Sequence, residues 1–237
     1  MTRTGSGLPV TVAAHGFGAS VAETRPLLSG VPGTKVFFEA RGHGTAPAPV
    51  QVGYDELADD LDAAAPDATQ ALGVSLGAHT VLRLLTRRPD RYAKAVLFLP
   101  AALDQPPVRR EGLVEALTAG DHDAVLAWVQ GELPPDRDTA SYAAARTSYL
   151  LSSPGLLALL RGLTEAPVPS LAALGAIETD VLVLAQEGDP VHPAQVGRDL
   201  AAALPKARLH VFDRPGVLWN HRSEFRDLVL GHLGEGA

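Results

Sequence analysis

The sequence predicts an α/β protein built on one open, mostly parallel sheet with helices on both faces. Short apolar runs alternate along the chain with longer segments of helical periodicity, which is typical of strand–helix–strand units. The short runs are almost continuously apolar, as expected of parallel strands that are covered on both faces. Six such runs predict strands at residues 10–14, 35–39, 71–74, 94–99, 181–185 and 208–212.

The segments between these runs have the spacing of amphipathic helices. Residues 54–64 place Leu57 and Leu61 on one face. Residues 77–88 carry four apolar side chains, and Pro89 marks the end of that helix. Two more helices are predicted at residues 193–204 and 221–233.

One long segment, residues 104–176, interrupts the alternation because no strand is predicted within it. Its periodicity predicts helices at residues 113–117, 123–130, 140–151 and 155–163. We interpret residues 1–103 and 177–237 as the α/β core and residues 104–176 as a helical cap inserted into it. The alternative is that these helices extend the core.

The composition limits the class of protein. A chain of 237 residues that is 46% hydrophobic can bury one sizeable core, so one domain is expected. The net charge of −7 argues against nucleic acid or an anionic membrane as a partner. The sequence has no cysteine and shows no apolar signal segment or membrane-spanning run, so a cytoplasmic location is expected. The oligomeric state stays open.

The strongest chemical signal is the run Gly73-Val74-Ser75-Leu76-Gly77, where an apolar run meets a helical segment. A serine on a sharp strand-to-helix turn exposes its hydroxyl, and flanking glycines leave room for the close backbones. We therefore interpret Ser75 as a nucleophile. The alternative is an ordinary glycine-rich loop between a strand and a helix.

A second glycine-rich loop, His15-Gly16-Phe17-Gly18, follows the first predicted strand. It lets a backbone N–H turn toward the site, so Phe17 and Leu76 are the candidates whose N–H groups form an oxyanion hole. His15 is expected to be structural or to line the site.

A serine nucleophile needs a base, and the base needs a carboxylate that orients it. Asp189 lies directly after the fifth predicted strand and is the candidate acid, with Glu187 as its competitor. His221 follows the last predicted strand and is the candidate base. The alternative interpretation of His221 is a surface histidine at the start of a helix. His192 stands beside prolines and is interpreted as structural or site-lining.

Together these residues resemble the α/β-hydrolase superfamily, as does the run Arg41-Gly42-His43-Gly44. The resemblance covers nearly the whole chain and implies the α/β-hydrolase fold, with a six- or seven-stranded sheet because the usual N-terminal hairpin is absent or very short. It also implies that Ser75 is the nucleophile, Asp189 the orienting acid and His221 the general base, with an oxyanion hole at Phe17 and Leu76. The chain departs from the family pattern at Val74 and in the residues before His221.

These features predict a serine hydrolase that needs no cofactor or metal and cleaves a small ester, thioester or lactone through an acyl-Ser75 intermediate. The apolar composition of the cap predicts a largely apolar substrate region. The candidate lining residues are His15, Trp128, Tyr142, Tyr149, His192 and Trp219. The alternative for Trp128, Tyr142 and Tyr149 is that they form the core of the cap. The alternatives are an enzyme of the same fold that cleaves C–C bonds or cyclises its substrate, and a small-molecule binding protein.

Overall fold

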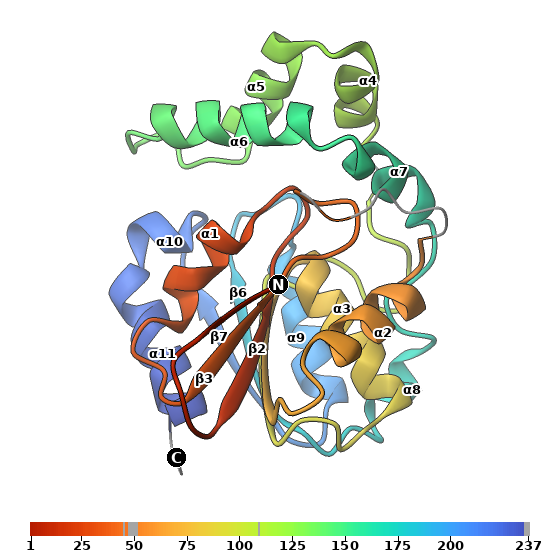
Figure 1. Cartoon of the computed structure of the whole chain (residues 1–237), viewed down its shortest axis with the longest axis vertical. Coiled ribbons are helices and arrows are strands. Elements are labelled where there is room, and N and C mark those ends of the chain that lie inside the picture. Colours follow the sequence, from red (N-terminus) through yellow and green to blue (C-terminus); the bar gives the residue numbers. More distant parts are fainter. Residues whose placement is uncertain (45, 47–51, 109, 235–237) are drawn as a thin grey trace.

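A seven-stranded sheet forms the centre of the computed structural model, which describes residues 1–44, 46, 52–108 and 110–234 (Figure 1). The strand order is β1-β3-β2-β4-β5-β6-β7, and every neighbouring pair except β1–β3 is parallel. The strands are β1 (Thr2–Thr4), β2 (Val10–Ala14), β3 (Thr34–Phe38), β4 (Gln70–Val74), β5 (Lys94–Phe98), β6 (Asp180–Gln186) and β7 (Ala207–Phe212). The predicted fold class is confirmed, and the six predicted strands agree with β2 to β7 to within one residue at each end.

The seventh strand, β1, contains three residues and pairs antiparallel with β3. It is too short to give a hydrophobic period, which is why its position was not predicted. The sheet therefore has seven strands, within the predicted range of six or seven.

Two layers of helices cover the sheet. On one face lie α2 (Tyr54–Ala64), α3 (Leu76–Arg87), α8 (Leu171–Leu174) and α9 (Ala194–Ala203). On the other face lie α1 (Val21–Thr24), the 3₁₀ helix η1 (Arg25–Leu28), α10 (Val217–Asn220) and α11 (Arg222–Gly234). Successive side chains of a strand point to opposite faces. Val12 therefore packs with the α2–α3 layer, whereas Ala13 packs with the η1–α11 layer. This double coverage explains the continuous apolar runs in the sequence.

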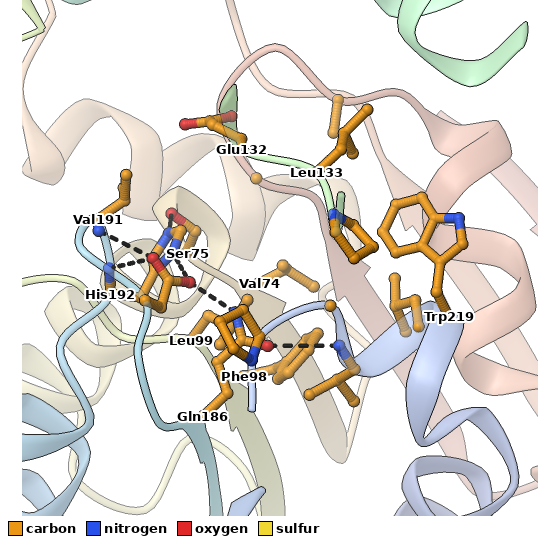
Figure 2. Close-up of a pocket in the computed structure, with 18 of the residues that line it drawn as sticks. Val74, Ser75, Phe98, Leu99, Glu132, Leu133, Gln186, Val191, His192 and Trp219 are labelled. Carbon is orange, nitrogen blue, oxygen red and sulfur yellow. Dashed lines mark hydrogen bonds and ion pairs between the residues drawn. The ribbon is translucent and has the colours of Figure 1, made fainter. Parts of the chain in front are cut away.

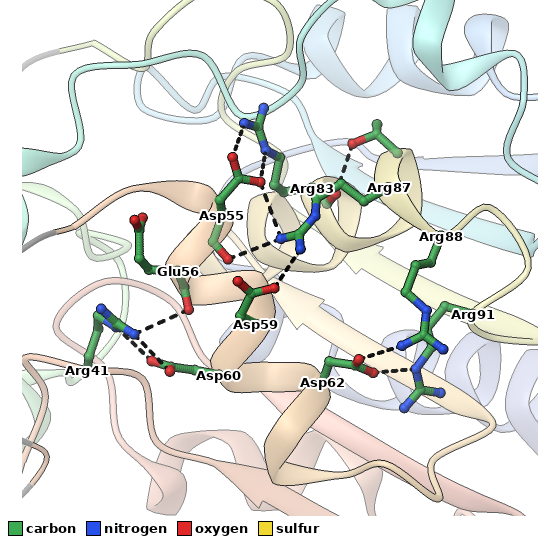
Figure 3. A network of polar contacts seen from close by, with 11 residues as sticks. Arg41, Asp55, Glu56, Asp59, Asp60, Asp62, Arg83, Arg87, Arg88 and Arg91 are labelled. Carbon is green, nitrogen blue, oxygen red and sulfur yellow. Dashed lines mark hydrogen bonds and ion pairs between the residues drawn. The ribbon is translucent and has the colours of Figure 1, made fainter.

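Helices α2 and α3 are also joined by ion pairs on their outer surface (Figure 3). The guanidinium of Arg83 donates two hydrogen bonds to Asp55, at 2.8 and 2.6 Å. Arg87 reaches Asp59 at 2.7 Å, and Arg91, in the turn after α3, reaches Asp62 at 2.5 Å. The Arg87–Asp59 pair is exposed on both sides, and an exposed pair of this kind stabilises a fold by at most about 1 kcal/mol. The main effect of these ion pairs is to fix the contact between the two helices.

The described part of the segment between β5 and β6 contains helices and connecting loops but no strand, as predicted. It contains α4 (Glu111–Ala119), α5 (His122–Gly131), α6 (Ala140–Ser152), α7 (Gly155–Gly162) and α8. Figure 1 shows α4, α5 and α6 beyond the ends of the strands, whereas α8 lies beside α9 in the core layer. The predicted helices match α4 to α7, although α4 and α5 are longer than expected. No helix among the described residues is long and apolar enough to cross a lipid bilayer.

The last predicted helix, residues 221–233, agrees with α11 to within one residue at each end. A short helix that was not predicted, α10, precedes it. Gly216 starts this arrangement with φ +79°, a left-handed conformation that glycine adopts at low cost. His221 lies at the junction of the two helices, and this position matters for the site.

Candidate active site

Ser75 occupies the sharp turn between β4 and α3. Its backbone has φ +49° and ψ −108°, a strained conformation for a residue with a side chain. Its N–H donates to the carbonyl of Phe98 at 2.9 Å, which ties the turn to β5. Gly73 is required because a Cβ there would lie 2.5 Å from the carbonyl oxygen of Gly77. A Cβ on Gly77 would overlap the carbonyl oxygen of Ala14. The two glycines of the motif thus have the structural role that the sequence suggested.

The side chain that meets Ser75 is His192 (Figure 2). Its Nε2 lies 2.9 Å from Ser75 Oγ, and its Nδ1 lies 2.9 Å from Asp189 Oδ2. An ionised carboxylate can only accept a hydrogen bond, so Nδ1 carries a proton and donates it to Asp189. Nε2 is then free to accept the hydroxyl proton of Ser75. The three side chains form one continuous hydrogen-bonded chain.

Asp189 is fixed by hydrogen bonds from its own loop. The N–H groups of Val191 and His192 donate to its Oδ1 at 2.8 and 3.0 Å, and the side-chain amide of Gln186 donates to Oδ2 at 2.6 Å. Burial acts to raise the pKa of Asp189. The hydrogen bonds from His192 and Gln186, together with the electrostatic attraction between the carboxylate and the imidazole, act more strongly in the opposite direction, so the pKa lies well below its usual range. Asp189 is therefore an ionised acceptor for the imidazole.

Glu187, the competing acid, points away from this group. Its side chain is 47% exposed and forms an ion pair with Arg198. The structure therefore brings Asp189, and not Glu187, to the imidazole.

His221 does not reach Ser75, and its predicted placement beside the serine is wrong. Its Nε2 lies 2.8 Å from Asp213 Oδ1, its Nδ1 lies 3.1 Å from Glu224 Oε2, and its ring packs against Phe212 at 5.3 Å between centroids. The physical reason is α10, because this helix carries the chain away from the sheet edge before residue 221. Val217, the first residue of α10, lines the larger cavity in this region, and His221 does not. The Val217 N–H lies 3.4 Å from Gln186 Oε1.

The loop after β2 brings Phe17 beside Ser75, and both residues line the same two cavities. Leu76 is the first residue of α3, so its N–H has no acceptor within the helix. Both candidate donors are therefore beside Ser75.

Two buried histidines fix the loop that carries Phe17. His15 accepts from the N–H of Ala40 at 3.1 Å and hydrogen-bonds through Nδ1 to the carbonyl of Gly16 at 2.8 Å. His43 accepts from the N–H of Gly18 at 2.9 Å. Burial, assisted by the nearby His15, lowers the pKa of His43 to about 3, and burial also lowers the pKa of His15. Both rings are neutral hydrogen-bonding groups. His15 lies behind the loop and does not line the cavities.

Two cavities meet at Ser75, with volumes of about 510 and 430 Å³. The larger lies under the helical segment and includes His192 and Trp219 (Figure 2). The smaller includes His79 and Leu76. Ser75, Phe17 and Arg110 line both. These volumes are in the range of small-molecule sites.

Three of the predicted lining residues are in the wall of the larger cavity: His192, Tyr142 and Trp219. The rings of Tyr142 and Trp219 meet edge to face at 5.3 Å. Trp128 and Tyr149 do not line either cavity and instead pack against the core, so their prediction as lining residues is wrong. Helical periodicity indicates that an aromatic side chain faces inward, but it does not distinguish the wall of a cavity from the packed core.

Several residues of this region were not recognised in the sequence. Gln186, the last residue of β6, orients Asp189, and Arg110 lies between the two cavities. His79 on α3 accepts from the N–H groups of Ala101 and Ala102 at 3.0 and 3.2 Å, which fixes the chain after β5. One feature of the sequence could have identified His192 as the base. It lies three residues after Asp189 in the same loop, so the two side chains can contact each other directly. No group of three or more His, Asp or Glu residues suited to a metal ion occurs in the described part of the chain.

The chain is similar in sequence to two proteins that are named as hydrolytic enzymes. It is 28% identical over 209 residues to the pimeloyl-[acyl-carrier protein] methyl ester esterase of Chromobacterium violaceum, an alignment that covers 81% of this chain and 80% of the relative. It is 27% identical over 210 residues to the 2-hydroxymuconate semialdehyde hydrolase of a Pseudomonas species, covering 82% and 73%. No protein-family model matches the sequence.

Solved structures share the fold over almost the whole chain. The enol-lactonase of Burkholderia xenovorans superposes with a TM-score of 0.85 at 19% identity, covering 99% of this chain and 95% of that one. The chain has the α/β-hydrolase fold. The meta-cleavage product hydrolase of Pseudomonas fluorescens superposes with a TM-score of 0.82 at 20% identity, covering 100% and 94%. The superfamily predicted from the motifs is thus confirmed, and with it the expectation of an enzyme. The predicted position of the histidine in this α/β-hydrolase needs correction.

Proposed function

We propose that this α/β-hydrolase is a serine hydrolase that cleaves an ester, thioester or lactone through an acyl-Ser75 intermediate. The observation that carries the proposal is the hydrogen-bonded chain from Ser75 through His192 to Asp189. A serine hydroxyl becomes a nucleophile when an adjacent base takes its proton, and a carboxylate beyond the base holds the imidazole in the required tautomer. His192 takes the role that the sequence had suggested for His221.

The reaction has two stages. His192 Nε2 takes the hydroxyl proton while Ser75 Oγ attacks the substrate carbonyl, and the resulting oxyanion is stabilised by the N–H groups of Phe17 and Leu76. His192 then gives its proton to the leaving group as the carbonyl–leaving group bond breaks. In the second stage His192 takes a proton from a water molecule as the water oxygen attacks the acyl carbonyl. His192 then returns this proton to Ser75 Oγ as the acyl–Oγ bond breaks, which releases the acid and restores the serine. Asp189 remains ionised throughout and stabilises the imidazolium.

The helical segment supplies much of the wall of the larger cavity, and we interpret it as the cap of this enzyme. Val129 and Leu133 line the cavity from this segment, and Leu27, Leu99 and Trp219 line it from the core. Tyr142 on α6 donates to Glu23 at 2.5 Å, and Arg146 donates to the carbonyl of Phe17 at 3.2 Å, so α6 is attached to the core beside the oxyanion loop. A small substrate with a substantial apolar part fits this wall.

A second candidate reaction uses the same site. One relative is named as a hydrolase of a semialdehyde and not of an ester, which supports hydrolysis of a C–C bond as the alternative reaction for this chain. That reaction also needs the base and the oxyanion donors. It differs from the first candidate in the bond that breaks.

Labelling with a fluorophosphonate probe, combined with a panel of p-nitrophenyl esters and thioesters, tests the proposal. The wild-type protein is expected to form a covalent adduct on Ser75 and to turn over short esters, and Ser75→Ala is expected to do neither. Ser148→Ala is the matched control because Ser148 is an exposed serine on α6. Labelling or ester turnover that persists in Ser75→Ala would contradict the proposal. Mass spectrometry of the protein quenched during turnover distinguishes the two reactions, because the ester reaction leaves an acyl group on Ser75.

A further inference from the structure

Arg110 is the one charged residue that lines both described cavities, and it shares this position with Ser75 and Phe17. It stands at the N-cap of α4, where the helical segment begins. Its side chain is only 18% exposed. A buried guanidinium is costly unless its N–H groups find acceptors. The surroundings of Arg110 therefore decide what it can bind.

No acceptor among the described residues lies within hydrogen-bond distance of the Arg110 guanidinium. The nearest carboxylate is Glu132, at 3.9 Å, which also lies 3.8 Å from Arg146. The rings of Phe17 and Trp128 lie 5.7 and 5.4 Å from the guanidinium carbon. These cation–π contacts stabilise the charge but leave the N–H donors unused.

Other shielded arginines of the chain are different. Arg83, whose side chain is 15% exposed, donates two hydrogen bonds of 2.8 and 2.6 Å to Asp55 (Figure 3). Arg146, at 14% exposed, donates to the carbonyl of Phe17 and the hydroxyl of Tyr142 at 3.2 and 3.1 Å. Arg110 is as shielded as these two but is left without an equivalent partner. Its unused donors therefore face the cavities.

The acidic side chains near Arg110 either accept hydrogen bonds from other residues or are exposed to solvent. Glu23 accepts from Tyr142 and Arg146, and Asp189 accepts from His192 and Gln186. Glu111 and Glu115 line the smaller cavity, but both are exposed. Burial lowers the pKa of Arg110, and Glu132 only partly opposes this effect. A guanidinium still remains charged in proteins at neutral pH, so an anion from outside would complete its contacts.

We propose that Arg110 binds a free carboxylate of the substrate, so that the preferred substrates are esters or lactones that also carry a carboxylate. The planar fork of an arginine matches a carboxylate through two parallel hydrogen bonds. The inference rests on the proposed function because it places the substrate carbonyl at Ser75. Arg110 is then a specificity-determining residue that positions one end of the substrate beside the nucleophile.

The experiment compares two series of esters with wild type, Arg110→Gln and Arg110→Lys. The first series consists of monomethyl esters of dicarboxylic acids with four to eight carbons. The second consists of methyl esters of monocarboxylic acids matched in length, which are neutral. The measured quantity is the ratio of kcat/KM for each charged ester to that for its neutral counterpart. Arg83→Gln is the matched control, because Arg83 is equally shielded and lines neither cavity.

We expect wild type to prefer the best charged ester by about 10- to 100-fold, the range for hydrogen bonds to a charged group. Arg110→Gln should lose this preference, Arg110→Lys should retain part of it, and Arg83→Gln should keep it. A wild type with no preference, or an Arg110→Gln variant that keeps it, would overturn the inference. So would an Arg110→Gln variant in which both series fall equally, since that indicates a structural role. Failure of the proposed function is a separate result, because the wild type would then hydrolyse neither series.

Discussion

His192 lies three residues after Asp189 on one loop, and its Nδ1 is 2.9 Å from the Oδ2 of that aspartate. The carboxylate also accepts the N–H groups of residues 191 and 192, so the same hydrogen bonds that shape the loop also orient the imidazole. Acid and base are therefore positioned as one unit after β6. Helix α10, which follows β7, contributes Val217 and Trp219 to the cavity wall and no group to the hydrogen-bonded chain of Ser75, His192 and Asp189.

The first prediction concerns the acid. Asp189→Asn should lower kcat by a factor on the order of 10³ to 10⁴ with little change in KM, because the amide cannot hold the imidazole in the tautomer that accepts from Ser75. Steady-state kinetics with a short ester measure the effect. Glu187→Gln is the control, because Glu187 is half exposed and paired with Arg198. An equal loss of kcat in both variants would contradict this assignment.

The second prediction concerns the pH dependence of stability. Burial lowers the pKa of His43 to about 3 in the folded state. In the unfolded chain a histidine has a pKa near 6.5, so the unfolded state binds the proton first as the pH falls. The stabilisation by neutral His43 is complete above about pH 6.5 and is lost as the pH falls toward 3. The free energy of unfolding should then decrease by up to about 1.4 kcal/mol per pH unit from this residue.

Urea unfolding at pH 7, 6 and 5 checks that expectation. His43→Gln keeps an acceptor for Gly18 but cannot take up a proton, so its stability should decline less steeply below pH 6.5 than that of wild type. His122→Gln on α5 serves as the control because His122 is exposed. Equal slopes for wild type and His43→Gln would show that His43 does not contribute to the pH dependence.

The third prediction concerns the turn that carries the nucleophile. Gly77→Ala should prevent normal folding or destabilise the protein severely, because the added Cβ would overlap the Ala14 carbonyl on β2. Gly112→Ala on α4 is the matched control, since a Cβ there meets no atom within 4 Å. Alanine in place of a helical glycine should stabilise by about 0.5 to 1 kcal/mol. Thermal unfolding of both variants measures the difference, and a Gly77→Ala protein as stable as wild type would contradict the close approach.

The sequence was informative where local physics determines the outcome. Continuous apolar runs identify strands that are buried on both faces, and the glycines around Ser75 indicate a turn with close backbones. Asp189 was also recognisable, because residues at the carboxyl ends of parallel strands gather at one edge of the sheet.

The base was not recognisable because its position depends on loop geometry. Periodicity does not reveal that the chain after Asp189 turns back so that His192 points at Ser75, and the prolines beside it suggested a structural role. The resemblance to the family favoured a late histidine, but α10 moves His221 away from the site. Arg110 was missed for a related reason, since its environment is made by residues from three separate segments: the loop after β2, α5 and the residues that follow α5.

The assignment of His192 as the general base is tested most directly by comparing kcat/KM for ester hydrolysis in His192→Ala and His221→Ala. We predict that His192→Ala lowers kcat/KM by a factor on the order of 10³ to 10⁴ or more, as expected when a general base is removed from a serine hydrolase. His221→Ala should stay within about threefold of wild type, because the His221 side chain contacts Asp213, Glu224 and Phe212 and none of the three hydrogen-bonded site residues. The reverse result, with activity lost in His221→Ala and kept in His192→Ala, would contradict the assignment of His192 as the general base.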